Sequence, residues 1–160
     1  MIGPGVDDAI AFFPINKAAE VQAGANLLEV LLANEFKVRS VCRGRGICAT
    51  CSVKVRGNPG CLSPATPQEL KTLSLIVGAD ASTRLACQSR VLGDGLTVEL
   101  PQGLYVGNLQ ELLDLIGEEA VSDYLHPVTG AVMIPKSKLI TRSQLQLFKT
   151  LTEEVSKVAN

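Results

Sequence analysis

Four cysteines in a fixed spacing constrain this chain more than any other feature of its 160 residues. Three fall within ten residues and the fourth follows 36 positions later; the four are Cys42, Cys48, Cys51 and Cys87. A two-iron, two-sulfide cluster needs this number of thiolates, since each iron takes two protein ligands besides the bridging sulfides. Gly44 and Gly46 lie between the first two cysteines, where glycine lets the backbone turn its N–H groups inward at close range. The pattern therefore predicts a metal or cluster site in a glycine-rich loop.

Other uses of clustered cysteines fit the sequence less well. Structural zinc usually takes two short cysteine knuckles, and the second knuckle is missing around Cys87. Unrelated buried thiols would not explain the glycine-rich loop, and five cysteines, an odd number, disfavour a disulfide framework. A Rieske centre needs two histidines, whereas the chain has only His126. Because His126 precedes a proline in a turn-rich segment, we expect it to be simply solvated.

The first hundred residues predict an α+β domain. The expected order is strand, strand, helix, strand, helix, strand, strand, over the segments Ala9–Ile15, Ala19–Ala23, Leu27–Leu32, Ser52–Arg56, a stretch beginning at Thr66, Leu85–Leu92 and Leu96–Leu100. Asn26 with Glu29, and Thr66 with Glu69, form capping boxes that begin the two helices. One face of the second helix would carry Leu70, Leu73 and Val77. This order suits a mixed sheet wrapped over a helix.

A shorter unit is expected after Pro101–Gly103, which divides the chain into residues 1–103 and a mostly helical C-terminal extension, residues 104–160. A helix is predicted from about Asn108 to Ile116, where Gly117 ends it. The last element begins at a capping box of Thr141 and Gln144 and carries apolar residues at helical spacing, namely Phe148, Leu151, Val155 and Val158. Apolar helix faces need a cover, so the extension is expected either to pack on the first domain or to form a homodimer.

The cysteine loop resembles that of [2Fe–2S] ferredoxins. Five residues between the first two cysteines, then two, then a long gap are what the vertebrate-type or adrenodoxin-like branch shows, including bacterial ferredoxins of cluster assembly. The segments Leu27–Val30, Arg84–Gln88 and Val98–Pro101 also match, so the resemblance covers roughly Ile10 to Pro101. It implies a β-grasp (ubiquitin-like) fold and a [2Fe–2S] cofactor. It also implies that the ligands are Cys42, Cys48, Cys51 and Cys87.

Several single residues near the cysteines have predicted roles. Cys61 has no counterpart in the ligand pattern, so we expect that it does not bind the cluster. Arg84 lies beside a ligand strand, where a structural ion pair is a better prediction than a partner contact. The small residues Ala49 and Thr50 are expected to leave the cluster near the surface, where an electron can leave.

Basic residues surround the cysteine loop. No acidic residue lies between Glu35 and Glu69, and the cations of this stretch are Lys37, Arg39, Arg43, Arg45, Lys54 and Arg56. Ferredoxins typically offer acidic patches, so this chain departs from the family here. We therefore expect the redox partners, a reductase and an acceptor, to bind near Arg39, Arg43 and Arg45 through an acidic surface of their own. Nearby cations favour the more negative reduced form, which predicts a midpoint potential above the roughly −400 mV of plant-type ferredoxins.

Two classes of function remain at this point. The first is a soluble one-electron carrier, and the second is a redox-sensing or scaffold module whose C-terminal helices report the state of the cluster. No nucleophile–base pair, phosphate loop or dinucleotide motif predicts an enzyme. The net charge of −1 and the absence of a long apolar run argue against nucleic acid and against a membrane span. We expect a cytoplasmic protein, or one of an organelle stroma if a transit peptide has been removed.

Overall fold

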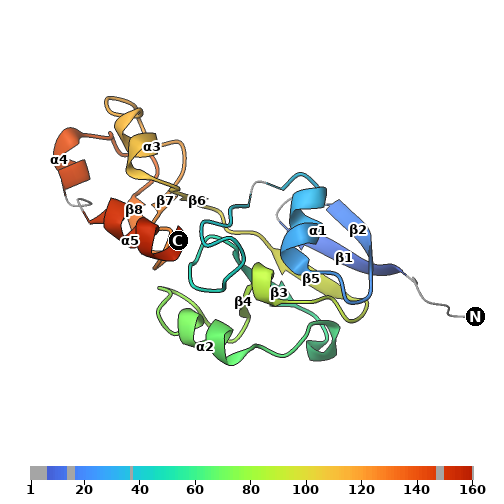
Figure 1. Cartoon of the computed structure of the whole chain (residues 1–160). Coiled ribbons are helices and arrows are strands. Elements are labelled where there is room, and N and C mark those ends of the chain that lie inside the picture. The colour runs from blue at the N-terminus through green and yellow to red at the C-terminus, as the bar shows by residue number, and fades with distance from the viewer. Residues whose placement is uncertain (1–6, 14–16, 37, 147–149, 160) are drawn as a thin grey trace, which may run out of the picture.

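The protein is described here by a computed structural model that covers residues 7–13, 17–36, 38–146 and 150–159. Five strands form the main sheet in the order β2-β1-β5-β3-β4 (Figure 1). They are β1 (Asp7–Phe13), β2 (Lys17–Gln22), β3 (Ser52–Arg56), β4 (Thr83–Leu85) and β5 (Leu96–Glu99). The pair β1–β5 is parallel and the other pairs are antiparallel, so the predicted mixed sheet is confirmed.

The first hairpin and the starts of the two helices follow the sequence prediction. Strands β1 and β2 pair along their length, although Asn16 of the predicted turn lies outside the described residues. Helix α1 (Leu27–Ala33) begins where the Asn26 side chain accepts a hydrogen bond from the Glu29 backbone N–H at 3.3 Å. Helix α2 (Pro67–Leu73) begins in the same way at Thr66. The apolar face of α1 joins the main hydrophobic core, whose members include Leu27, Leu31, Val53, Leu85 and Val98.

The predicted strand Leu85–Leu92 is wrong. Strand β4 ends at Leu85, and the chain turns at once into a short 3₁₀ helix, η2 (Ala86–Gln88). The turn is fixed because the Asn26 side chain donates a hydrogen bond to the Cys87 carbonyl at 2.9 Å. Nor do the last two strands form a hairpin, since β5 lies between β1 and β3. This turn is what brings Cys87 towards the other cysteines.

The predicted apolar face of α2 is wrong for two of its three residues, since only Leu73 packs against the main core. Leu70 and Val77 are exposed by 57% and 64%, and the helix ends before Val77. Its buried residues are instead Glu69 and Thr72. Thr72 donates a hydrogen bond to the Gly46 carbonyl at 2.5 Å, so a polar edge of the helix holds the cysteine loop. The hydrogen bonds of these polar side chains therefore help to determine which side of α2 packs against the rest of the protein.

The C-terminal region, residues 104–160, contains a small sheet that the sequence did not predict. Its strands are β6 (Leu104–Tyr105), β7 (Tyr124–Leu125) and β8 (Val132–Ile134), in the order β6-β7-β8. Among the described residues of this region, three helices accompany it, α3 (Leu109–Leu113), α4 (Arg142–Gln146) and α5 (Leu151–Ala159). A second hydrophobic core joins these elements and includes Val106, Leu112, Ile134, Ile140 and Leu151. The expectation of a mostly helical extension is thus only partly right, because strands of two or three residues are too short to show alternation.

The last predicted element, which begins at Thr141, forms two helices in the described residues, α4 and α5. The Thr141 and Gln144 capping box is confirmed, since each side chain accepts a hydrogen bond from the other residue's backbone N–H. Phe148 and the side chain of Val158 lie outside what is described. None of the helices in the described ranges has both the length and the apolar character needed to cross a bilayer.

Candidate cluster site

The fold brings the four predicted ligand cysteines together. The cluster loop, residues 40–51, carries Cys42, Cys48 and Cys51, and η2 carries Cys87. The thiols of Cys48 and Cys87 lie near enough to that of Cys42 to change its pKa, and the Cys87 thiol does the same for Cys51. The first three side chains are buried, whereas Cys87 is partly exposed. All four are free thiols.

These contacts move the thiol pKa values in opposite directions. Hydrogen bonds from Cys48 and Cys87 lower the pKa of Cys42, and a hydrogen bond from Cys87 lowers that of Cys51. The contact with Cys42 raises the pKa of Cys48, and contacts with Cys42 and Cys51 raise that of Cys87. Thiols that influence one another in this way are neighbours and can bind one small inorganic group. Thiolate is the form in which cysteine binds a metal.

The cluster loop has the left-handed backbone that its glycines predict. The φ angles are 81° at Gly44 and 74° at Gly46, and Arg43 also has a positive φ of 56°. Gln88 holds the loop from the other side, since its amide donates a hydrogen bond to the Gly44 carbonyl at 2.9 Å. The same amide nitrogen lies 3.5 Å from the Cys87 sulfur. The loop is therefore wrapped around the place where the thiols meet.

The donor set fits a two-iron cluster. Among the described residues, no three Cys, His, Asp or Glu side chains are placed to hold a single ion. The thiols instead adjoin as Cys42 with Cys48 and Cys51 with Cys87, linked by the contact of Cys42 with Cys87. A [2Fe–2S] cluster takes two thiolates at each iron, which is what such pairs can provide.

Arg84 forms the predicted structural ion pair. Its guanidinium Nε lies 2.9 Å from Glu69 Oε1, with Glu69 fully buried and Arg84 exposed by 13%. Arg84 also donates a hydrogen bond to the Ser63 carbonyl, and Glu69 accepts one from the Leu85 backbone N–H. The pair thus ties α2 to the end of β4, two residues before Cys87.

Cys61 lies in a second short 3₁₀ helix, η1 (Pro59–Cys61). Its side chain is buried, and its thiol donates a hydrogen bond to the Asp94 carbonyl at 2.6 Å. That carbonyl belongs to the turn before β5. That Cys61 does not bind the cluster stays a prediction.

The expectations for Ala49, Thr50 and His126 are wrong for one shared reason, the packing of the C-terminal region on the cluster loop (Figure 1). Ala49 and Thr50 are buried, and the Ala49 backbone N–H donates to the Pro127 carbonyl at 2.8 Å. His126 is only 13% exposed, and its Nε2 lies 2.6 Å from Glu154 Oε2. The turn signal around Pro127 was visible in the sequence, but its contact with the loop was not.

Much of the predicted basic surface is neutralised by carboxylates. Three of its cations form ion pairs, Arg39 with Glu111, Lys54 with Asp80 and Arg56 with Glu99. Arg45 donates a hydrogen bond from Nε to the Cys42 carbonyl, and Lys37 lies outside the described residues. Arg43 is exposed, and in the described part of the chain no ion pair involves it.

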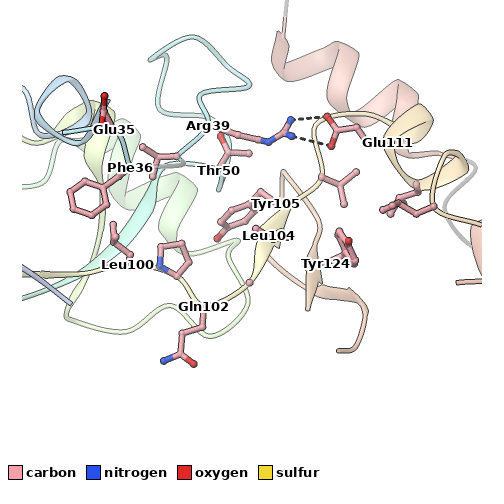
Figure 2. A pocket seen from close by; sticks show the side chains of 16 residues that line it. Glu35, Phe36, Arg39, Thr50, Leu100, Gln102, Leu104, Tyr105, Glu111 and Tyr124 are labelled. Carbon is pink, nitrogen blue, oxygen red and sulfur yellow. Dashed lines mark hydrogen bonds and ion pairs between the residues drawn. The ribbon is translucent and has the colours of Figure 1, made fainter. Parts of the chain in front are cut away.

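A cavity of about 1050 Å³ lies between the first domain and the C-terminal region (Figure 2). Phe36 and Thr50 line it from the first domain, and Tyr105 and Tyr124 line it from the small sheet. The ion pair of Arg39 with Glu111 crosses its edge with two hydrogen bonds, 2.8 and 3.1 Å long. The two parts of the chain therefore meet at a boundary that is only partly filled.

Comparison with known proteins agrees with this site. A family model described as "2Fe-2S iron-sulfur cluster binding domain" matches residues 13–92. The chain is 30% identical to a 2Fe-2S ferredoxin of Escherichia coli K12 over 89 residues, which span 56% of this chain and 80% of that protein. It is 33% identical to a 2Fe-2S ferredoxin of Haemophilus influenzae over 91 residues, which span 57% and 80%.

A solved structure shows the same similarity. The crystal structure of the ISC-like [2Fe-2S] ferredoxin from Pseudomonas putida superposes with a TM-score of 0.55 and 31% sequence identity, covering 59% of this chain and 92% of that one. The family match ends at residue 92, so residues 104–160 lie outside it.

Proposed function

Since this chain belongs to the 2Fe-2S iron–sulfur cluster binding domain family, we propose that it shuttles single electrons between a reductase and an acceptor protein. It is a ferredoxin-type electron carrier with a [2Fe–2S] cofactor, and it is not an enzyme. When bound, the cofactor supplies reversible one-electron chemistry. The observation that carries the proposal is that three cysteines of a glycine-rich loop, all buried, adjoin a fourth on η2.

The cofactor's ligands in this proposal are Cys42, Cys48, Cys51 and Cys87. The thiol contacts and the left-handed glycines support the assignment. The chain's own part is to hold four sulfurs in place, to turn the loop backbone around them and to keep water away. Burial of Cys42, Cys48 and Cys51 serves the last of these tasks.

The finer classification is the adrenodoxin-like branch, with a β-grasp domain at residues 1–103 and an appended C-terminal region at residues 104–160. The five-residue spacing from Cys42 to Cys48 and the likeness to an ISC-like ferredoxin support the branch. The two separate hydrophobic cores support the division. The odd number of cysteines, which disfavours a disulfide framework, suits a reducing compartment such as cytoplasm or stroma.

The redox partners bind near Arg39, Arg43 and Arg45 through an acidic surface of their own. Exposed Arg43 supports this, because it directly follows Cys42 and puts a positive charge on the cluster loop itself. Arg39 contributes less than the sequence predicts, because Glu111 offsets its charge. Electron-transfer rates should therefore fall as salt rises.

One observation favours a second function, a redox sensor. The C-terminal region bonds the cluster loop directly through Ala49, so a change at the cysteines could reach the C-terminal helices. A sensor, or a homodimer formed through this region, would change its elution volume on gel filtration between the oxidised and reduced forms. A carrier would keep one elution volume.

The first experiment compares two cysteine variants with the unmodified protein, all purified without oxygen. Cys87→Ala should lose the visible absorption bands and the spin-one-half resonance that dithionite produces, because one iron loses a ligand. Cys61→Ala is the matched control and should keep both signals. A colourless protein with stoichiometric zinc would refute the electron-carrier proposal, and loss of the bands in Cys61→Ala would refute the ligand assignment.

A further inference from the structure

A turn of the C-terminal region lies directly on the cluster loop. It comprises residues 126–130, and we call it the cover. The Pro127 carbonyl accepts the Ala49 backbone N–H at 2.8 Å, and the Thr129 carbonyl accepts the Val77 backbone N–H at 2.8 Å. Val128 packs against the buried side chains of Cys42 and Cys48. The cover thus contacts both the loop that carries three ligand cysteines and the chain that follows α2.

His126 holds the cover in shape. Its Nδ1 accepts hydrogen bonds from the backbone N–H groups of Val128, at 3.1 Å, and Thr129, at 3.2 Å. An imidazole nitrogen that accepts two N–H groups carries no proton, so the proton lies on Nε2. That Nε2–H donates to Glu154 Oε2 of α5 at 2.6 Å. One side chain therefore fastens the turn at one end and anchors it to a helix at the other.

We propose that residues 126–130 are a built-in cover that closes the Ala49–Thr50 side of the cluster loop, with His126 as its positioning residue. Electrons consequently enter and leave on the side of Cys87, the one partly exposed ligand among the four. This turn lies outside the family match, which ends at residue 92. This inference depends on the proposed function only for the identity of the group that the cysteines bind. The packing of residues 126–130 on the cluster loop does not depend on it.

A closed cover has physical consequences that can be measured. Water near the cysteines would stabilise the more negative reduced form, so excluding it keeps the midpoint potential lower. It also slows the approach of oxygen to the buried sulfurs. Loosening the cover should therefore raise the potential, speed bleaching in air and expose the Ala49 amide to exchange with solvent.

Three variants test the cover in the 160-residue chain. His126→Ala removes both the Nδ1 acceptor and the link to α5. His126→Asn keeps an acceptor, since an asparagine side-chain oxygen can accept N–H groups two and three residues on, but it cannot reach Glu154. Glu154→Gln keeps a hydrogen-bond acceptor for Nε2 and removes only the charge. The readouts are hydrogen exchange of peptides that contain Ala49 and Val77, the rate of bleaching in air, and the midpoint potential.

We expect His126→Ala to increase exchange at both peptides and the bleaching rate severalfold, and to raise the potential. His126→Asn should restore most of the protection, and Glu154→Gln should lie close to the unmodified protein. If His126→Ala does not fold, His126→Asn decides, because it lacks the link to α5 and should still exchange and bleach measurably faster than Glu154→Gln, which keeps that link. Unchanged exchange and bleaching in all variants that fold would overturn the cover.

The Cys87 side is tested with a small anionic oxidant, ferricyanide, acting on the reduced protein. Arg43 lies next to Gly44, which Gln88 binds beside Cys87, so Arg43→Glu should slow oxidation severalfold by repulsion. Lys157→Glu makes the same charge change on α5, the helix that anchors the cover, and should leave the rate unchanged. Equal oxidation rates in the unmodified protein and both variants, or equal slowing in both variants, would refute electron transfer on the Cys87 side.

The experiments distinguish a wrong proposal for the function from a wrong proposal for the cover. A protein without visible bands or a reduced-state resonance would refute the electron carrier, yet exchange at Ala49 would still report on the cover. A protein with normal bands and unprotected Ala49 would refute the cover alone.

Discussion

Gly44 and Gly46 share a left-handed backbone but differ in what surrounds them. A Cβ at Gly44 would meet nothing within 4 Å, whereas a Cβ at Gly46 would lie 2.8 Å from Cδ of Gln88. Alanine at either position loses about 1–2 kcal/mol to backbone strain. Only at Gly46 must the Gln88 side chain also move, which breaks its hydrogen bond to the Gly44 carbonyl.

We therefore predict that Gly46→Ala is the more damaging of the two variants. Gly44→Ala should show the strain alone, and Gly46→Ala should lose about 1 kcal/mol more together with part of its bound iron. Thermal unfolding and the iron content after anaerobic reconstitution measure the two effects. Equal losses would mean that Gln88 does not hold the loop.

The contact of α2 with β4 depends on one buried ion pair. Glu69→Gln keeps the shape of the side chain but leaves the Arg84 guanidinium without its carboxylate in a largely buried place. Removing one partner of a buried pair typically destabilises by about 3–5 kcal/mol, so we expect a loss near the lower end, since Ser63 still accepts from Arg84. Urea denaturation measures it.

Glu99→Gln is the matched control for Glu69→Gln. Glu99 pairs with Arg56, whose side chain is 73% exposed, so its loss should stay within about 1 kcal/mol. Similar losses in the two variants would contradict the view that the Glu69–Arg84 pair fixes α2.

Local hydrogen bonding explains which elements could be predicted. The caps at Asn26, Thr66 and Thr141 involve residues three apart, so the sequence shows them directly. The end of β4 and the buried side of α2 depend instead on partners far along the chain. Asn26 fixes the Cys87 turn from 61 residues away, and no periodicity within the strand indicates that bond.

The whole molecule differs from the prediction most where its two parts meet. The four cysteines could be grouped from their spacing alone, but the burial of Ala49 follows from Pro127, a contact between distant segments. The basic surface was overestimated for the same reason, because Glu111 reaches Arg39 from 72 residues away. Cysteine spacing indicates the site, whereas tertiary packing decides which of its sides is open.

The two parts of the chain should unfold together. Tyr105 of β6 packs against the first core, and its hydroxyl hydrogen-bonds that of Ser52 at 2.8 Å, so part of the boundary is apolar and protected from salt. The Arg39–Glu111 pair is exposed by 47% and 36% and should contribute less than about 1 kcal/mol.

We therefore predict one calorimetric transition in low and in high salt, and a change within about 1 kcal/mol for Glu111→Gln. Salt screens exposed ion pairs but leaves apolar contacts and backbone hydrogen bonds such as Ala49 to Pro127 in place. A second transition that appears in high salt, or in Glu111→Gln at low salt, would mean that the ion pair holds the two parts together.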